Sequence, residues 1–378
     1  MVIGQFCDVY PPELDGVGMV TKSYAEELSQ FGDECYYVAP YAAQERNYDF
    51  QALLYHSVKV PGEAYRTGMP ALDPKYRRKV SDIEFDIVHA HSPFASGREA
   101  LHLAKRRNIP IVATFHSKYY DDFYDKTHNR HLASAGTNAV VQFYNQCDEV
   151  WAVSEKTAEV LRGYGYSRSI QIMPNGTNPC SVSPADIAEA FLRFGLDEKP
   201  VFLFVGQLNW KKNIRKVLEA AAIYAKQHPF HLVLAGQGPD EKEIRKYAKE
   251  LGILPHVIFT GHIADRRLLM GLYACADMLV FPSLYDNAPM VVREAASAGT
   301  ASILVRGSCA AECIDNGVNG LLCEDDAQSI ADCMEIGVQR KKQLGDAAKE
   351  TIPKPWVEIV RTVRLRYADL ISNKKISS

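Results

Sequence analysis

The sequence lacks the features that mark several classes of protein. None of its apolar runs approaches the roughly 20 residues that a helix needs to cross a bilayer. The first residues, MVIGQFCDVYPP, have neither the basic start nor the long apolar core of a signal peptide. The nine cysteines show no CxxC spacing, so we expect reduced thiols in the cytoplasm rather than a disulfide framework. The net charge of −3 provides no overall attraction to nucleic acid.

What the sequence does contain is an alternation of short apolar runs with amphipathic segments. MVIGQFC is followed by the helical GMVTKSYAEELSQFG and then by ECYYVAP, and the rhythm continues through FDIVHAH and IPIVATFHS. Such a βαβ pattern predicts a parallel sheet with helices on both faces. The pattern pauses at residues 181–199, which contain no strand-like run and form a plausible junction, and it restarts at PVFLFVG.

The sequence therefore predicts an α/β fold with two tandem Rossmann-like, doubly wound domains, which a length of 378 residues can supply. We expect the boundaries to lie at 1–180 and 181–355. The last segment, WVEIVRTVRLRYADLI, has the apolar spacing of an amphipathic helix. We expect this helix, 356–372, to pack back on the first domain.

In such folds ligands bind beyond the carboxyl ends of the strands, so the residues after each apolar run are the candidates for a site. Gly16 and Gly18 bracket Val17 after the first run, before a helix. Glycines there would let backbone amides approach an anion, although an ordinary turn is an alternative. Lys211 and Lys212 follow PVFLFVG. They suit a phosphate or a diphosphate, unless they form a solvated surface pair.

Three histidines also end apolar runs. His116 follows IPIVATF, and we expect it to act in a site as a hydrogen-bond donor or proton carrier. His89 and His91 lie on one face at the end of the preceding run. A metal site is conceivable there, but no carboxylate or cysteine completes it, so a hydrogen-bonded structural role is favoured.

The stretch YDNAPMVVREAASAG follows a buried strand and carries the signals of a helix. Asn287 is a reasonable cap, Pro289 suits a first helical turn, and Gly299 is a stop. Asp286 then precedes the helix, and Glu294 lies about two turns inside it, at about 12 Å along the axis. A glycosidase pair needs only about 5–9.5 Å. We therefore interpret the two acids as holding separate parts of one long ligand, with a phosphate at the helix N-terminus between them.

A nucleotide-sugar has this anatomy, and at this point the chain resembles the family 4 retaining glycosyltransferases of the GT-B fold, whose two domains face a central cleft. That family carries a Glu, seven residues and a second Glu, where this sequence has Asp286 and Glu294. The resemblance covers nearly the whole chain. Its other landmarks are PNG at 174–176, AGQGP at 235–239, TGHI at 260–263 and NGVNGLL at 316–322.

The resemblance implies a role for each matching position. Glu294 should bind the ribose hydroxyls, Asp286 the donor hexose, and Lys212 the diphosphate. Gly16 and Val17 should approach the donor from the first domain, His116 should lie near the reacting sugar, and the backbone near Ile263 should read the base. The other donor-binding positions are Gln207, Asn287, Ala288 and Met290. His116, Asp286 and Lys212 are thus the expected catalytic residues, and no metal is expected, because basic side chains and helix dipoles offset the charge of the leaving group.

Three departures from the family pattern affect the donor site. The first acid is Asp rather than Glu, Pro289 removes a backbone amide, and Gln207 replaces the usual phosphate-binding Arg. Less positive charge then faces the diphosphate, and Lys211 and Arg293 are the candidates to compensate.

The resemblance implies transfer of a hexose, with glucose favoured, from a UDP-sugar to an acceptor held by the first domain. HAHSPFASG and TFHSKYYDDFY are most like glucosyltransferases that act on diacylglycerol. KYRRK at 75–79 and KRR at 105–107 suit an anionic membrane surface, and a peripheral place on the inner face of the cell membrane, unless they are a solvated face. Two alternatives stay open: transfer to a soluble or polyprenyl-linked glycan, and a non-catalytic nucleotide-sugar-binding subunit, which Gln207 and Pro289 favour.

Overall fold

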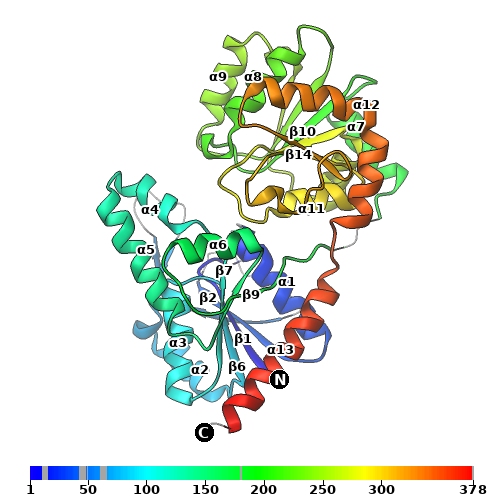
Figure 1. Ribbon diagram of the computed structural model, residues 1–378. Helices are drawn as coiled ribbons and strands as arrows, with labels where there is room; N and C mark the ends of the chain where they lie inside the picture. The colour runs from blue at the N-terminus through cyan, green and yellow to red at the C-terminus, as the bar shows by residue number, and fades with distance from the viewer. Residues whose placement is uncertain (11–15, 42–47, 49, 60–65, 179–180, 377–378) are drawn as a thin grey trace. The chain divides into compact units, whose positions relative to one another are not determined.

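The computed structural model describes residues 1–10, 16–41, 48, 50–59, 66–178 and 181–376 (Figure 1). The chain forms two compact units. The first contains Met1–Gly176 together with Trp356–Ser378, and the second contains Thr177–Pro355. The first unit is therefore built from both ends of the described chain.

The first unit has a sheet of seven parallel strands in the order β3-β2-β1-β6-β7-β8-β9. Strand β1 lies where the strand order reverses and pairs Ile3 with Cys35 on one side and with Ile87 on the other. Most strand residues are buried, which explains why the strands were recognisable as unbroken apolar runs. The strands are β1 (Val2–Phe6), β2 (Glu34–Pro40), β3 (Gln51–Tyr55), β6 (Ile87–Ala90), β7 (Ile111–Phe115), β8 (Glu149–Ala152) and β9 (Gln171–Ile172), with a separate antiparallel ribbon of β4 (Ser57–Lys59) and β5 (Arg66–Gly68).

Helices connect these strands and cover both faces of the sheet (Figure 1). Helix α1 begins at Gly16, so Gly16 and Val17 lie in its first turn and not in a turn that precedes it, as the sequence had suggested. Residues 11–15 lie outside the described part of the chain. The helices are α1 (Gly16–Gln30), η1 (Pro70–Leu72), α2 (Pro74–Asp82), α3 (Ala95–Arg107), α4 (Tyr119–Thr127), α5 (Arg130–Tyr144), α6 (Glu155–Gly163) and α13 (Trp356–Ile376).

The last helix, α13, packs on the first unit beside α1 (Figure 1). Its apolar stripe buries Trp356, Val360, Val363 and Tyr367. A methyl group added to Gly176 would lie 2.4 Å from the Trp356 ring, so the glycine of the PNG motif makes room for this tryptophan. Two ion pairs also fasten the helix: Arg364 Nε lies 2.5 Å from Asp33 Oδ2, and Arg366 Nε lies 2.8 Å from Glu149 Oε2.

The second unit has a sheet of six parallel strands in the order β12-β11-β10-β13-β14-β15. Counted from β10, this is the order 3-2-1-4-5-6 of a Rossmann fold, with the strand order reversing between β10 and β13. The strands are β10 (Val201–Val205), β11 (His231–Ala235), β12 (Val257–Gly261), β13 (Met278–Val280), β14 (Ser302–Val305) and β15 (Gly320–Cys323). The helices are α7 (Pro184–Arg193), η2 (Trp210–Lys212), α8 (Ile214–Tyr224), α9 (Glu241–Glu250), η3 (Leu254–His256), α10 (Arg266–Cys275), α11 (Met290–Ser297), η4 (Ala310–Cys313) and α12 (Ala327–Thr351).

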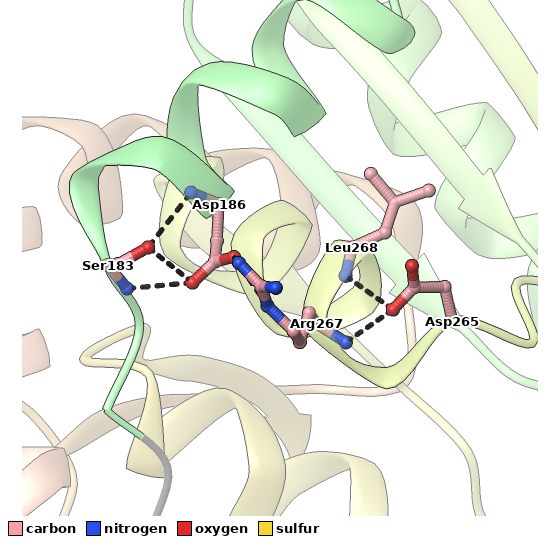
Figure 2. A network of polar contacts seen from close by, with 5 residues as sticks. All are labelled: Ser183, Asp186, Asp265, Arg267 and Leu268. Atoms are coloured by element: carbon pink, nitrogen blue, oxygen red, sulfur yellow. Dashed lines mark hydrogen bonds and ion pairs between the residues drawn. The ribbon is translucent and has the colours of Figure 1, made fainter.

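Residues 181–199 contain no strand, but they are not the simple junction that the sequence suggested. They hold α7, which packs on α10 in the second unit. Ser183 and Asp186 cap α7 reciprocally: Ser183 Oγ accepts from the Asp186 amide, and Asp186 Oδ2 accepts from the Ser183 amide (Figure 2). Asp186 Oδ1 also accepts from Arg267 Nη2 of α10 at 2.6 Å. The Ser183 hydroxyl and then Arg267 lower the pKa of Asp186 to about 2, so its carboxylate is ionised at neutral pH.

The contact between α7 and α10 predicts a large effect of one methyl group. A methyl at Gly271 would lie 2.3 Å from the Asp186 carbonyl oxygen, so α10 could not approach α7 as closely. We expect Gly271→Ala to lower the free energy of unfolding of the second unit by about 1–3 kcal/mol. Gly163→Ala is the matched control, because a methyl there meets nothing within 4 Å. Denaturant unfolding followed by circular dichroism measures both, and equal stability of the two variants would contradict the close contact.

Candidate functional site

The carboxyl edge of the second sheet is held together by backbone contacts. The Gly206 amide donates to the Ala235 carbonyl and the Gly236 amide to the Gly261 carbonyl, both at 3.0 Å. Gly236 has a φ of +143°, and a methyl group there would lie 1.9 Å from the Gly206 carbonyl oxygen. Only glycine fits this position. The AGQGP motif therefore fixes the loops after β10, β11 and β12 against one another.

Lys212 and Asp286 form an ion pair at this edge. Lys212 ends η2 after β10, Asp286 lies between β13 and α11, and Nζ is 2.5 Å from Oδ1. Asp286 Oδ2 accepts a hydrogen bond from Ser283 Oγ at 2.6 Å, and the Lys212 ammonium lies 5.3 Å from the centre of the Tyr285 ring. The two charged side chains are only 15% and 18% exposed. The structure thus brings together two of the three residues that were expected to be catalytic.

Helix α11 begins later than the sequence suggested. Its first residue is Met290, and Pro289 is the N-cap, with an extended ψ of 130°, so Asn287 is not the cap and Pro289 is not in the first turn. Proline disfavours a helical conformation in the residue before it, so Ala288 does not open the helix and Asn287 does not cap it. The extended ψ of Pro289 itself moves the start one residue further. Glu294 is consequently the fifth residue of the helix, just over one turn inside, and not two turns inside.

Glu294 has a separate set of partners. Its carboxylate is buried, with Oε1 accepting from Arg266 Nη1 at 2.7 Å and Oε2 accepting from the Tyr273 hydroxyl at 3.1 Å. Both partners lie on α10. Burial raises the pKa of Tyr273 well above its ordinary value, so this hydroxyl stays protonated and donates. Asp286 and Glu294 therefore belong to two contact sets, one on the loops after β10 and β13 and one on α10.

The remaining predicted positions of the second unit lie after β10, after β12 and at the approach to α11. Ile263 follows β12 and lines a cavity of about 230 Å³ together with Phe194 and Leu268. Gln207 is exposed after β10, where its Oε1 accepts from Asn209 Nδ2 at 3.2 Å. Asn287 is buried, whereas Ala288 and Met290 are half-buried in the approach to α11.

Of the two cations proposed to compensate for Gln207, Lys211 lies near the ion pair. Its Nζ is 5.4 Å from the centre of the same Tyr285 ring that Lys212 approaches. Arg293 is desolvated, which lowers its pKa, and Cys313 and Glu312 of η4 lie near it. Arg293 thus lies near η4. The cation that pairs with Glu294 is Arg266, which the sequence analysis did not select. Arg266 follows the apolar run HVIFTG by a few residues, so the rule that selects residues after strands could have found it.

The three histidines lie at the carboxyl edge of the first sheet. His116 Nε2 is 3.2 Å from His91 Nδ1, and the two rings stack with centroids 5.4 Å apart. His89 Nε2 is 2.7 Å from Thr114 Oγ1. Burial lowers the pKa of all three, for His116 to about 3, so the imidazoles are neutral near pH 7. His89 and His91 use ring nitrogens in hydrogen bonds.

Within the described residues, no three His, Cys, Asp or Glu side chains are grouped so that they could hold a metal ion. Among the same residues, no helix has the length and apolar character that crossing a membrane requires.

The lowered pKa values predict how the first unit responds to acid. The unfolded chain binds a proton at each histidine near pH 6.5 while the folded chain does not, so stability falls as the pH drops below 6.5. For His116 this continues to about pH 3. We expect His116→Gln to reduce the slope of the free energy of unfolding by up to about 1.4 kcal/mol per pH unit between pH 6.5 and 5.

The measurement uses urea unfolding in a Trp210→Phe background, because the other two tryptophans, Trp151 and Trp356, belong to the first unit. The exposed His102→Gln is the control for replacing a histidine by glutamine. An unchanged slope in His116→Gln would show that His116 takes up its proton in the folded protein.

Two family models match this chain. The one described as Glycosyltransferase Family 4 matches residues 14–179, and the one described as Glycosyl transferases group 1 matches residues 187–351. The two matches follow one another and correspond closely to the two compact units.

Curated relatives span most of the chain. A GDP-mannose-dependent alpha-mannosyltransferase of Corynebacterium glutamicum is 26% identical over 386 residues, which cover 98% of this chain and 90% of the relative. An alpha-monoglucosyldiacylglycerol synthase of Streptococcus pneumoniae is 26% identical over 314 residues, covering 79% of this chain and 70% of the relative. Among solved structures, HepE of Anabaena in complex with UDP-glucose has a TM-score of 0.80 at 18% identity and covers 98% of this chain and 100% of its own. At that identity, the likeness shows the fold.

Proposed function

The chain belongs to family 4 of the glycosyltransferases and has their GT-B fold, and from this premise we propose that it transfers glucose from UDP-glucose to a membrane lipid such as diacylglycerol, with retention of the anomeric configuration. The observation that carries the proposal is the presence of the two contact sets in the second unit. Lys212 and Asp286 form one set, and Glu294 with Arg266 forms the other.

Each set suits one part of a nucleotide-sugar. A carboxylate has only acceptor oxygens, and two neighbouring ribose hydroxyls can donate to both oxygens of Glu294. The Lys212 ammonium can leave Asp286 for the diphosphate, where it stabilises the charge that develops as UDP departs. Asp286 is then released to accept from hexose hydroxyls. The first amides of α11, starting at Met290, add the positive end of a helix dipole beside this pair.

His116 completes the proposed catalytic set at the reacting sugar. Its imidazole is neutral because burial lowers its pKa to about 3, so it can accept a hydrogen bond at physiological pH. We propose that the reaction needs no metal ion, since Lys212 and the α11 dipole supply positive charge where a metal would otherwise do so.

A lipid acceptor is supported by a basic surface on the first unit. The α2 residues Arg77, Arg78 and Lys79 are exposed, and Arg107 of α3 donates to the carbonyls of Val80 and Ile83 at the end of α2. The basic runs of α2 and α3 therefore lie side by side. Leu72, just before α2, has 71% of its surface exposed, which adds an apolar contact of the kind that peripheral membrane proteins insert.

The alternative of a soluble or polyprenyl-linked glycan acceptor shares the same donor site. One similar chain is named as a GDP-mannose-dependent mannosyltransferase, so the base and the hexose of the donor vary among similar chains. A non-catalytic, nucleotide-sugar-binding subunit remains the second candidate, favoured by Gln207 and by the missing amide of Pro289.

The two contact sets predict different defects. Glu294→Ala should weaken binding of free UDP by about 1.5–3 kcal/mol, because a charged hydrogen-bond acceptor for the ribose is lost. His116→Ala should leave UDP affinity nearly intact, and Asp286→Ala should leave it no weaker, because that change frees Lys212 for the diphosphate. Both variants should depress turnover strongly, as expected for contacts with the reacting sugar. Calorimetry with UDP and a UDP-glucose turnover assay measure the two effects.

The assays are run in excess chelator, and a strict requirement for a divalent metal would contradict the metal-free proposal. Equal loss of UDP binding in Asp286→Ala and Glu294→Ala would contradict the division of roles. A wild-type protein that binds UDP but turns over no UDP-glucose would favour the binding subunit.

The basic surface predicts binding to anionic vesicles. Neutralising Arg77, Arg78 and Lys79 to Gln together should weaken partition onto phosphatidylglycerol vesicles about 100-fold, at about 1 kcal/mol per basic residue. The matched control neutralises three exposed lysines of α9, Lys242, Lys246 and Lys249, and should bind almost as the wild type does. Vesicle flotation measures both, and equal binding by the two variants would argue against this surface.

A further inference from the structure

A chain of hydrogen bonds joins His116 to the last helix through the core of the first unit. It runs from His116 to His91 (3.2 Å), from His91 Nε2 to Gln5 Oε1 (2.7 Å) and from Gln5 Nε2 to the Tyr367 hydroxyl (3.1 Å). A branch continues from Tyr367 to His89 Nδ1 (2.5 Å). These residues come from β1, β6, the ends of β6 and β7, and α13, so five hydrogen-bonding side chains converge from distant parts of the sequence.

The interior of this network is closed to water. Gln5, His89 and Tyr367 are 0% exposed and His91 is 1% exposed. Burying such polar groups is unfavourable unless each finds a partner, and an apolar core would be more stable than an incompletely bonded one. Here each of the five side chains makes at least one hydrogen bond to another member. Such bonds in a buried network fix the orientation of its members, which is a property that apolar packing alone does not supply.

The Gln5 amide determines which atoms donate and which accept along the network. Its carbonyl oxygen can only accept, so the proton between Gln5 and His91 belongs to His91 Nε2. A neutral imidazole carries one proton, so His91 Nδ1 is an acceptor and His116 Nε2 is the donor to it. On the other side, the Gln5 amide donates to Tyr367, which leaves the Tyr367 O–H available to donate onward to His89 Nδ1.

Neighbouring rings restrict Tyr367. Trp151 stacks on its ring with centroids 5.7 Å apart and an interplanar angle of 13°, and His89 meets it edge-on at 5.9 Å. Such packing holds the hydroxyl at one position, so Tyr367 can serve as the fixed end of the chain of hydrogen bonds.

We propose that Tyr367 is a positioning residue that acts through Gln5 and His91 to hold His116 as the Nε2–H tautomer, with Nδ1 as the acceptor for a hydroxyl of the donor hexose. The proposal rests on the proposed function for the contact between His116 and the sugar. The tautomer itself is a property of the first unit and does not depend on the substrate. Without the Tyr367 hydroxyl, the Gln5 amide loses its acceptor and is free to turn over, which would reverse the proton order in His91 and mix the two tautomers of His116.

The test uses the full-length chain and removes single hydroxyl groups. Tyr367→Phe deletes the end of the network and keeps the ring. Tyr24→Phe is the matched control, because Tyr24 packs edge-on against His89 and His91 at 5.6 and 5.3 Å and no hydrogen bond among the described residues joins its hydroxyl to the network. Gln5→Leu interrupts the chain at its middle. Thermal unfolding verifies that each variant folds.

Two readouts follow these variants. In protein labelled with ¹⁵N-histidine, with the His116 signals assigned by loss in His116→Gln, proton–nitrogen correlations identify the ring nitrogen that carries the proton. Steady-state turnover of UDP-glucose then separates kcat from KM. We expect Nε2–H at His116 in the wild type and in Tyr24→Phe, and mixed tautomers in Tyr367→Phe and Gln5→Leu. The same two variants should lose about tenfold in kcat with little change in the KM for UDP-glucose.

Several outcomes would overturn the proposal. Wild-type His116 protonated at Nδ1 would do so, as would a Tyr367→Phe variant with an unchanged tautomer and unchanged kcat. An equal loss of kcat in Tyr24→Phe would assign the effect to packing. If the wild type turns over no UDP-glucose, the proposed function fails instead, and the tautomer in Tyr367→Phe still decides whether Tyr367 positions His116.

Discussion

The reversal of strand order beside one central strand is the constraint on which both units depend. Parallel strands are joined by right-handed crossovers, so helices on either side of the reversal lie on opposite faces of the sheet. The loops that leave β10 and β13 therefore diverge, and in sheets of this kind ligands bind at that point. Lys212 follows β10 and Asp286 follows β13. The polypeptide thus places a cation and an anion at the same point from segments 74 residues apart, without any local sequence signal that joins them.

Both acids of the candidate donor site carry a cation of their own. Lys212 lies on Asp286, and Arg266 lies on Glu294. A half-buried carboxylate with such a partner is compensated, whereas removing one partner alone leaves an unpaired charge in a poorly solvated place. These two ion pairs change what the glutamine at position 207, in place of the usual arginine, implies for the charge of the site. Two acids there are already matched by two cations, and Lys211 lies near the Lys212–Asp286 pair as well, so the glutamine does not leave the acids short of positive charge. In the proposed function, a diphosphate would draw Lys212 away from Asp286.

The sequence predicted the sheets well because strands buried on both faces appear as unbroken apolar runs, as PVFLFVG does for β10. It predicted the positions of Lys212 and Asp286 through the rule that ligands bind after strands. The start of α11 was wrong because the effect of Pro289 on the residue before it was overlooked. Helix α7 was missed although SPAD, a serine with an acid three residues later and a proline between, is a capping signal. The pairing of Gln5 with Tyr367 could not be predicted, since 362 residues separate them and one lies in an ordinary strand.

The return of α13 to the first unit has a consequence for synthesis on the ribosome. Residues 177–355 are translated between the body of the first unit and the helix that completes it. At about 5–20 residues per second this takes about 10–35 s. Throughout that interval, the surface that later receives Trp356, Val360 and Val363 is without its cover, and the buried hydrogen bonds of Tyr367 are unmade. The second unit has all of its own residues first and can be the earlier of the two to reach its final form, so the part of the protein made first is finished last.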